Sequence, residues 1–381
     1  MAELRIGTLL PTAGDLKVGS LNVLKIYNGG VLVFGDGTFN ENLGTGPRNT
    51  VKSISIQSDG KIIFAGISLF SFNGNSIGSP ARLNTDGTLD SAYMANRAGQ
   101  GDNANLANTT TLHPDGSVLI GGRRDTTRAF SKINDDGTAD TTFNTNAGSF
   151  NNSTDNVYAI DVSGTIILIV GSFGDGNIKK YDLNGNEDTN FGSGISGFGT
   201  SSTIRTIKTQ SDGKILVGGD FSTFNFTSIN RLVRLNSDGS IDTSFTTNQG
   251  DGILNGGVYS IAIQSDGKIL VGGSFTFVDG SDKERLFRLN SDGTYDNDFY
   301  DNLGDGFNNP VYSVEVQSDG KILVGGTFNQ FDGNIRNRLV RLNSDGTEDT
   351  SFYTNLTNGV PGEVWITETQ TDGKIFVGGN F

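Results

Sequence analysis

The sequence predicts an all-β protein, a seven-bladed β-propeller of four-stranded antiparallel blades in which the N-terminal segment closes the last blade. Three observations predict this fold. The chain has 55 Gly among 381 residues, together with many Asn, Asp, Ser and Thr, and these residues favour tight turns. Two phrases recur about every fifty residues, which is a spacing typical of propeller blades. The C-terminus stops in the middle of one such repeat.

The first recurring phrase is Gln-Ser-Asp-Gly-Lys, a hairpin signal because Asp-Gly readily adopts the backbone conformations of a tight turn. Its clear copies begin at Gln57, Gln210, Gln264, Gln317 and Gln370, and weaker copies begin at His113 and Asp161. The second phrase is Arg-Leu-Asn-Ser-Asp-Gly. Its copies begin at Arg82, Lys132, Arg234, Arg288 and Arg341, with a worn copy at Tyr181. Because the two phrases recur in the same order, the chain is an array of equivalent units.

One unit shows the strands that we expect in each. Residues 258–264 alternate apolar and polar side chains, and Asp266-Gly267 turns this strand into a second strand over 268–275. The pair Gly272-Gly273 indicates a bulge or the close approach of another backbone. Residues 285–290 are the third strand, and residues 294–299 are a short fourth strand. No segment shows the 3.6-residue apolar periodicity of a helix.

The two ends of the chain predict how the ring closes. Residues 374–381 match the second strand of a seventh blade, which then lacks its third and fourth strands. Residues 31–43 match the third-strand segment that begins at Leu339. The N-terminal segment should therefore complete the last blade and remove an open sheet edge. Residues 21–381 form the propeller in this prediction, and residues 1–20, which have no counterpart in a blade, form a docking segment.

The charge and the composition exclude several classes of function. The net charge of −14 and the pI of about 4.5 argue against a nucleic-acid partner, which needs a basic surface, and against an anionic membrane. There is no apolar run of about 20 residues, so we expect no membrane insertion. The chain has no Cys, which excludes disulfides and thiolate metal sites. No signal peptide is visible at the N-terminus.

The phrase Gln-Ser-Asp-Gly-Lys-Ile-Leu-Val-Gly-Gly at Gln317–Gly326, followed by Arg-Leu-Asn-Ser-Asp-Gly-Thr at Arg341–Thr347, resembles the bacterial "delta sixty" repeat propellers. The resemblance covers about residues 21–381 and is specific, because both phrases recur in order. The copies at His113 and Asp161 depart from the pattern, which puts the loops there in doubt. The family is defined by its repeat and implies no shared activity.

A shorter resemblance concerns the N-terminus. Residues 17–20 and 24–33 resemble the short β-hairpin segment near the ends of many phage tail and virion proteins. The alternative is that these residues are only the strand pair that closes the ring. The resemblance implies a virion protein, attached to the tail, a fibre or the capsid, with other virion proteins as its partners.

Candidate catalytic and metal-binding residues are few. His113 is the single histidine, and its place in a turn slot beside Pro114 favours a divergent turn residue over a general base or metal ligand. The Asp/Asn/Gly turns, such as residues 290–296, offer oxygen ligands of the kind that Ca²⁺ prefers, but they lack the spacing of an EF-hand and recur in every unit. We expect hairpin turns and no cofactor, and leave calcium open.

Paired carboxylates for glycan hydrolysis would have to face one cleft. Most acidic residues occupy repeat slots, which point to equivalent places around a ring. The acids outside these slots form no recognisable pattern: Asp251, Asp301, Asp305, Glu363 and Glu368. We therefore expect a protein that is not an enzyme.

The variable loops are the predicted binding surface. Aromatic residues beside Asn or Asp suit a sugar ring, which has an apolar face and a polar edge. The candidate binding residues are Phe226, Phe277, Phe331, Asp305, Phe307 and Asn308. The alternative is that the regularly placed Phe residues pack between blades.

These observations predict a non-enzymatic phage virion structural protein whose propeller contacts other virion proteins or a host-surface glycan. The first alternative is a bacterial cell-surface or secreted adhesion module with an extracellular location. The second alternative is a glycan hydrolase with acids around the central channel.

Overall fold

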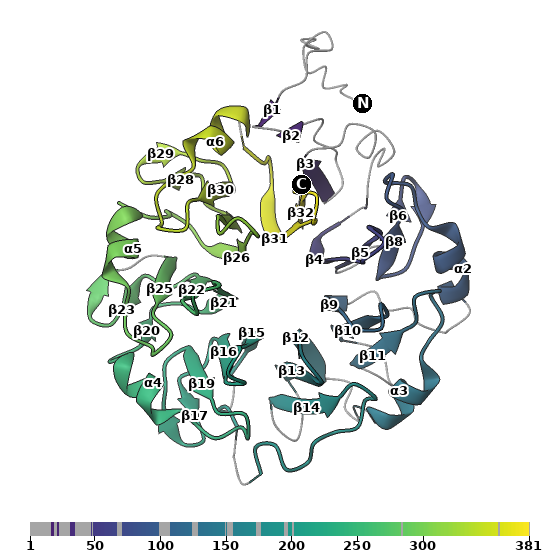
Figure 1. Ribbon diagram of the computed structural model, residues 1–381, viewed down its shortest axis with the longest axis horizontal. Coiled ribbons are helices and arrows are strands. Elements are labelled where there is room, and N and C mark those ends of the chain that lie inside the picture. The colour runs from purple at the N-terminus through teal and green to yellow at the C-terminus, as the bar shows by residue number, and fades with distance from the viewer. Residues whose placement is uncertain are drawn as a thin grey trace, which may run out of the picture.

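The fold is a ring of small antiparallel sheets around a central channel (Figure 1). The structure is a computed structural model that describes residues 17–18, 21–22, 31–34, 47, 49–66, 71–98, 107–123, 129–148, 150, 155–172, 177–193, 197–199, 202–282, 285–356 and 359–380. Most of the predicted docking segment, residues 1–20, lies outside these ranges. Of this segment the structure describes β1 (Lys17–Val18), which pairs with β2 (Leu21–Asn22) just beyond it.

Each sheet in the ring has the same order of strands. In one of them β21 (Val258–Ile263) pairs with β22 (Ile269–Gly273), which pairs with β25 (Leu286–Leu289). Four sheets repeat this order: β4 (Val51–Ile56), β5 (Ile62–Gly66) and β8 (Ala81–Leu83); β9 (Ala107–Leu112), β10 (Val118–Gly122) and β11 (Phe130–Ile133); β12 (Asn156–Ser163), β13 (Ile166–Ser172) and β14 (Ile178–Asp182); β15 (Ile204–Thr209), β16 (Ile215–Gly219) and β19 (Leu232–Leu235). A further sheet contains β26 (Val311–Val316), β27 (Ile322–Gly326) and β30 (Leu339–Leu342).

The last sheet joins the two ends of the chain. In it β31 (Glu363–Thr369) pairs with β32 (Ile375–Asn380), and β32 pairs with β3 (Val31–Phe34). Val31 lies opposite Gly378 and Phe34 opposite Ile375. This pairing confirms the prediction that the N-terminal segment completes the C-terminal sheet. The innermost strands contact one another in a closed cycle, from β4 through β9, β12, β15, β21 and β26 to β31 and back to β4.

The predicted fourth strand is wrong in most of its length. After the third strand the chain makes one bridge, Leu289 to Tyr295, and then forms the short helix α5 (Asn297–Asn302). The helix begins here because the Asp296 side chain accepts a hydrogen bond from the backbone N–H of Phe299, which is an N-cap interaction. The same slot in other repeats holds α2 (Ser91–Ala98), α3 (Thr141–Asn146), α4 (Thr243–Asn248) and α6 (Thr350–Leu356). None of the helices in the described ranges is long and apolar enough to span a bilayer.

Neighbouring sheets pack so closely that glycine is required between them. A Cβ atom at Gly272 would lie 2.7 Å from Cγ2 of Val314 and 2.8 Å from Cγ1 of Val311, both on the next innermost strand. Within its own sheet, a Cβ atom at Gly273 would lie 2.1 Å from the carbonyl oxygen of Gly257, the residue before β21. The close approach that the glycine pair predicted is therefore present, and apolar residues of the two sheets fill the remaining space as one cluster.

The two recurring phrases form a hydrogen-bond network between adjacent sheets. The Arg288 guanidinium donates to Asp296 Oδ2 at 3.0 Å, to Gln264 Oε1 at 2.9 Å and to the Ser344 carbonyl oxygen of the next sheet. Lys268 Nζ donates to the same Asp296 oxygen at 2.7 Å. Equivalent bonds surround Arg82 and Arg234. The repeat phrases thus encode contacts that hold one sheet to its neighbour.

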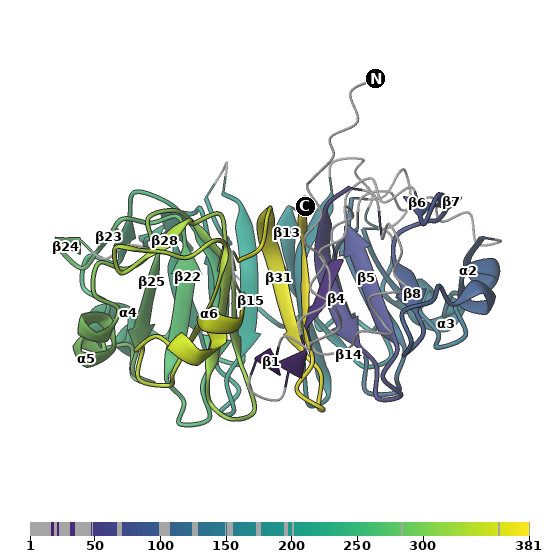
Figure 2. The same cartoon turned by 90° about the horizontal axis from the view of Figure 1, so that it is seen from above.

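The ring has two different faces (Figure 2). The turns that contain Gln-Ser-Asp-Gly-Lys lie on one face, where the innermost strands end. On the opposite face, where those strands begin, short hairpins join the second and third strands. We call this the hairpin face, and its hairpins are β6 (Ser71–Phe72) with β7 (Asn75–Ser76), β17 (Thr223–Phe224) with β18 (Thr227–Ser228), β23 (Phe277–Val278) with β24 (Ser281–Asp282), and β28 (Gln330–Phe331) with β29 (Asn334–Ile335). The strand β20 (Ile253–Leu254) pairs with β23 on this face.

Candidate functional site

The central channel encloses a cavity of about 740 Å³ whose wall is made by the innermost strands. At its mouth on the hairpin face, seven side chains surround a space of about 380 Å³. We call these residues the collar, and they are Lys52, Asn108, Tyr158, Arg205, Tyr259, Tyr312 and Trp365. None of the collar residues was among the binding residues predicted from the sequence.

A β-bulge in each innermost strand explains the position of the collar. In β21 the pairing with β22 passes from Val258 to Ser260 and leaves Tyr259 without a partner. The register shifts at the equivalent place in the other innermost strands, and the residue that each shift leaves out is the collar residue. A bulge redirects a side chain out of the regular alternation of a strand. The repeated bulge therefore turns one side chain from each strand toward the channel mouth.

Five collar residues form a continuous arc. The Tyr312 and Trp365 rings are stacked, with their centroids 4.4 Å apart and their planes at 16°. The Tyr259 ring lies 5.5 Å from Tyr312. A cation lies over each end of the row, because Lys52 Nζ is 5.0 Å from the Trp365 ring centroid and the Arg205 guanidinium carbon is 4.8 Å from that of Tyr259. Such cation–π contacts hold the row in one arrangement.

Polar groups lie beside this arc. Arg205 donates to Asp220 Oδ2 at 2.6 Å, and Trp365 Nε1 donates to Glu363 Oε2 at 3.2 Å. Asn108 and Tyr158 complete the collar between the two cations. Burial, and then the positive charge of Arg205, lower the pKa of Lys52. The mouth of the channel therefore combines a row of aromatic rings with two cations.

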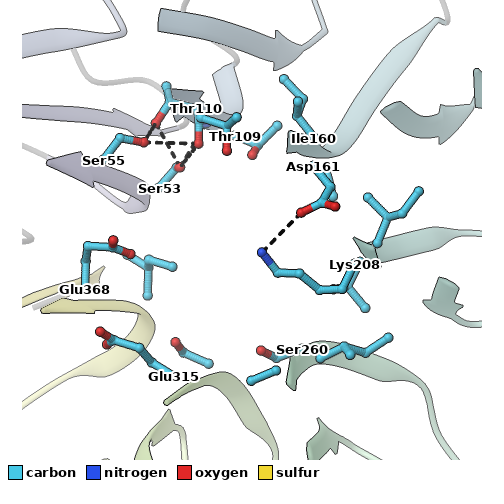
Figure 3. A pocket seen from close by; sticks show the side chains of 18 of the residues that line it. Ser53, Ser55, Thr109, Thr110, Ile160, Asp161, Lys208, Ser260, Glu315 and Glu368 are labelled. Atoms are coloured by element: carbon cyan, nitrogen blue, oxygen red, sulfur yellow. Dashed lines mark hydrogen bonds and ion pairs between the residues drawn. The ribbon is translucent and has the colours of Figure 1, made fainter. Parts of the chain in front are cut away.

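A second ring of side chains lies deeper in the channel (Figure 3). Glu315 and Glu368 come from the adjacent strands β26 and β31 and point into the channel together, while Lys208 pairs with Asp161 at 3.5 Å from the other side. Burial, and then the neighbouring charge of Glu315, raise the pKa of Glu368 to about 8. Burial also raises the pKa of Glu315. At neutral pH, Glu368 is therefore mostly protonated.

The binding residues predicted from the sequence have different environments in the structure. Phe307 and Phe331 are 0% and 2% exposed, and their rings pack 4.7 Å apart, so both are core residues and do not reach a ligand. Phe277 is half-buried on β23, while Asp305 and Asn308 are exposed on the hairpin face. These residues lie on the hairpins and loops outside the collar, so the structure does not bring them together with the side chains of the channel mouth.

Phe226 is 88% exposed and is the predicted binding residue with the most unusual geometry. It occupies the second turn position of the β17–β18 hairpin with φ of 60°, a left-handed conformation that is unfavourable for a bulky residue. The other hairpins hold Gly74, Gly280 and Gly333 in this slot. A strained and exposed aromatic side chain contributes little to folding, so Phe226 remains a predicted contact residue.

We expect Phe226→Gly to raise the free energy of unfolding by about 1 kcal/mol, because relief of the left-handed strain exceeds the extra chain entropy of glycine. Denaturant unfolding of the purified protein measures the change. Phe226→Ala is the matched control, since it removes the ring but keeps a Cβ atom in the strained slot, and it should give no such gain. Equal stability of the two variants would contradict the strain that we assign to this turn.

His113 and the Asp-Gly turns have structural partners. His113 is buried in its turn, with Nε2 3.0 Å from the Leu183 carbonyl oxygen and Nδ1 2.7 Å from Asp115, in the slot that Gln264 occupies elsewhere. In the turn at Asn290, Asp292 Oδ1 accepts from the backbone N–H and the hydroxyl of Thr294. Among the residues that the structure describes, no group of three or more acidic or histidine side chains is arranged to hold a metal ion.

The sequence did contain a signal for the collar. Tyr259 and Tyr312 both stand in the phrase Val-Tyr-Ser, and Trp365 stands in the same slot after Val364. In a regular strand the residue after the buried valine points to the opposite face of the sheet. Its position would then be one of several equivalent positions on that face. The bulge that distinguishes it is a property of the pairing with the second strand and is not visible in one strand alone.

A protein-family model described as "Domain of unknown function (DUF5122) beta-propeller" matches residues 57–93, 113–143, 210–245, 264–299 and 317–352. No curated protein matches the chain. The fold, the repeat and this match together define the chain as a β-propeller repeat protein.

Solved structures with similar folds are propellers of low sequence identity. The extracellular domain of the hybrid two-component system BT3049 from B. thetaiotaomicron is 16% identical with a TM-score of 0.52, over 86% of this chain and 40% of that one. The WD40 β-propeller domain of Doa1 is 15% identical with a TM-score of 0.53, over 88% and 91%. PorZ, a surface component of the type-IX secretion system of Porphyromonas gingivalis, is 12% identical with a TM-score of 0.50, over 87% and 47%. The match thus spans less than half of the BT3049 and PorZ chains, and at these identities the likeness concerns the fold alone.

Proposed function

We propose that this propeller is a non-enzymatic binding module that takes a glycan at the collar. We also propose that each three-stranded sheet of the ring, with its bridge and helix, is one blade, which gives seven blades. The single observation that carries the functional proposal is the row of Tyr259, Tyr312 and Trp365 at an open channel mouth.

The chemistry of the collar suits a sugar. Because Tyr312 and Lys52 cover the two faces of the Trp365 ring, the aromatic row presents ring edges to the space at the mouth. The apolar C–H groups of a pyranose would pack against these edges while its hydroxyls bond with polar groups beside them. Here the aromatic row is flanked by Asn108, Tyr158, Arg205 and Glu363. The space of about 380 Å³ falls in the range of small-molecule sites. The bulge that recurs in the innermost strands turns these side chains toward the channel mouth, where a ligand can reach them.

We expect Trp365→Ala to weaken glycan binding about 30-fold or more, because truncation of a central aromatic contact removes about 2 kcal/mol or more. Isothermal titration of the full chain against a panel of soluble oligosaccharides measures the loss. Trp365→Phe is the matched variant, since it keeps an aromatic face and should retain part of the affinity. If both variants bind every ligand as the parent does, the collar is not the site.

The setting that we propose is the surface of a phage particle, where the propeller would meet other virion proteins and a host-surface glycan. The support is the N-terminal resemblance at residues 17–33, most of which lies outside the described residues. The alternative is a bacterial surface or secreted module, for which the extracellular domain of BT3049 and the surface component PorZ are precedents of fold. Mass spectrometry of purified particles and of the cell envelope distinguishes the two, since the virion proposal requires the chain in the particles.

Glycan hydrolysis is a second candidate function, favoured by Glu315 and Glu368 in the channel wall (Figure 3). A glycosidase needs one protonated and one ionised carboxyl group across the scissile bond. Glu368 fits the protonated role, but the raised pKa of Glu315 works against the ionised one. Release of reducing ends from a bound glycan, lost in Glu315→Gln and Glu368→Gln, would establish this activity. If a glycan binds but no reducing ends are released, the hydrolase candidate fails and the proposal of a non-enzymatic binding module stands.

A further inference from the structure

We propose that the collar selects glycans that carry carboxylates, that is, acidic sugars of the uronic-acid type. This inference rests on the glycan-binding function proposed above and adds the charge of the ligand to it. The geometry that points to it is the placement of Lys52 and Arg205 at the two ends of the aromatic row, around one space that a ligand can enter.

The collar is divided into two unlike halves. One half is the aromatic row from Tyr259 through Tyr312 to Trp365. The other half runs from Lys52 through Asn108 and Tyr158 to Arg205, and it carries two positive charges, an amide and a phenol. A sugar whose apolar C–H groups pack against the ring edges of this row would turn its other substituents toward this second half. A carboxylate among those substituents would meet both cations.

Lys52 is the collar cation that an anionic ligand would stabilise most. Its side chain is half-buried, and among the described residues no carboxylate forms an ion pair with it. Burial of an unpaired ammonium is unfavourable, and a second cation at the same site makes it more so. Arg205 is already paired with Asp220 at the outer edge of the collar. Glu363, the other carboxylate beside the collar, accepts from Trp365 Nε1 and forms no ion pair with Lys52 among the described residues. Lys52 is therefore the collar cation that a carboxylate of a ligand would pair with.

The side chains below the collar offer a carboxylate no free cation among the described residues. Glu315 and Glu368 line the channel farther in, and Lys208 there is engaged by Asp161 (Figure 3). A ligand carboxylate that moved deeper would leave Lys52 and Arg205 without meeting an unpaired positive charge. This arrangement favours a ligand bound at the mouth, with its acidic group beside the cations.

The test compares oligogalacturonate with its methyl ester, two ligands that share the sugar ring and differ in charge. We expect the full-length chain to bind the acid about tenfold or more tightly than the ester, since a charge-assisted contact contributes 1.5 kcal/mol or more. Added NaCl should weaken the binding of the acid and leave the binding of the ester unchanged. Lys52→Met keeps the side-chain stem over Trp365 but removes the charge, and it should lower the acid's affinity to that of the ester.

The outcomes separate the two proposals. Equal, salt-independent binding of acid and ester, unchanged in Lys52→Met, would overturn the selection for carboxylates and leave the glycan site intact. Failure of every glycan to bind, with Trp365→Ala identical to the parent, would remove the proposed function itself. Binding of poly-glutamate as tight as that of oligogalacturonate would also overturn the inference, because the collar would then select acidic chains of any backbone. Circular dichroism of Lys52→Met shows that it is folded, and the salt dependence of the parent protein tests the charge without any variant.

Discussion

Arg288→Ala should lower the free energy of unfolding by about 3–5 kcal/mol, the largest change that we expect from a single substitution in this chain. The Arg288 side chain is 8% exposed and serves three acceptors at once: Asp296, Gln264 and the Ser344 carbonyl of the next sheet. Its guanidinium also lies 4.2 Å from the centre of the Phe299 ring. Alanine would leave the buried Asp296 carboxylate without the hydrogen bond and ion pair from Arg288, and with only the remaining bonds to stabilise its charge. Burial alone raises the pKa of Asp296, and the bonds to Lys268 and Arg288 outweigh it and lower that pKa.

Lys268→Ala is the matched control because Lys268 donates to the same Asp296 oxygen, at 2.7 Å, from a side chain that is 32% exposed. Partial exposure lets water replace the lost bond, so the expected decrease is about 1 kcal/mol or less. Urea unfolding followed by circular dichroism measures both variants. If the two substitutions destabilise the protein equally, the second recurring phrase does not act as the contact between sheets that we describe.

Glu368→Gln should stabilise the protein at alkaline pH, by about 4–5 kcal/mol at pH 9. The carboxyl of Glu368 faces Glu315 from the adjacent strand, with Lys208 and Asp161 across the channel. The pKa of this carboxyl is about 8 in the folded protein and near its ordinary value of 4.5 in the unfolded chain. The folded state therefore holds a proton that the unfolded state has lost between these two values. The parent protein should lose stability as the pH rises from about 4.5 through 8.

The pH dependence of this difference supplies its own control. Below about pH 4.5 the carboxyl is protonated in both states, so the parent protein and Glu368→Gln should unfold with nearly the same free energy. Above pH 8 the glutamine variant avoids a buried charge and should be the more stable protein. Denaturant unfolding at a series of pH values gives the curve. A stability difference that is constant across the series would mean that Glu368 is not the group that titrates.

The sequence predicted the repeat architecture because each element of it is encoded locally. The Asp266-Gly267 turn, the apolar strands and the Gly272-Gly273 pair stand where the structure has them, and residues 31–34 close the last sheet as expected. The fourth strand was mispredicted because a single Asp at position 296 starts a helix that is too short to show a periodicity. The N-cap interaction outweighed the strand-like pattern of the phrase before it.

The candidate site could be predicted only in part, because its residues depend on contacts between distant segments. Phe226 and Phe331 both stand in hairpins of the same kind, yet one is 88% exposed and the other is 2% exposed. The two residues occupy different slots, because Phe331 is a strand residue equivalent to the buried Phe224, whereas Phe226 stands in the turn slot that Gly333 occupies in the other hairpin. Glu368 stood out in the sequence as an acid outside the repeat slots, but its partner Glu315 comes from a different strand. The packing of the innermost strands of two consecutive sheets places these two carboxyls side by side.

Titration of Trp365 fluorescence with oligogalacturonate tests the central claim most directly. The chain contains one tryptophan, and that residue lies in the collar, so its emission reports on this site alone. Our account predicts a saturable change in emission whose midpoint equals the affinity measured by calorimetry and moves to higher ligand concentration in Lys52→Met. Calorimetric binding without any change in tryptophan emission would place the ligand elsewhere and would contradict the account.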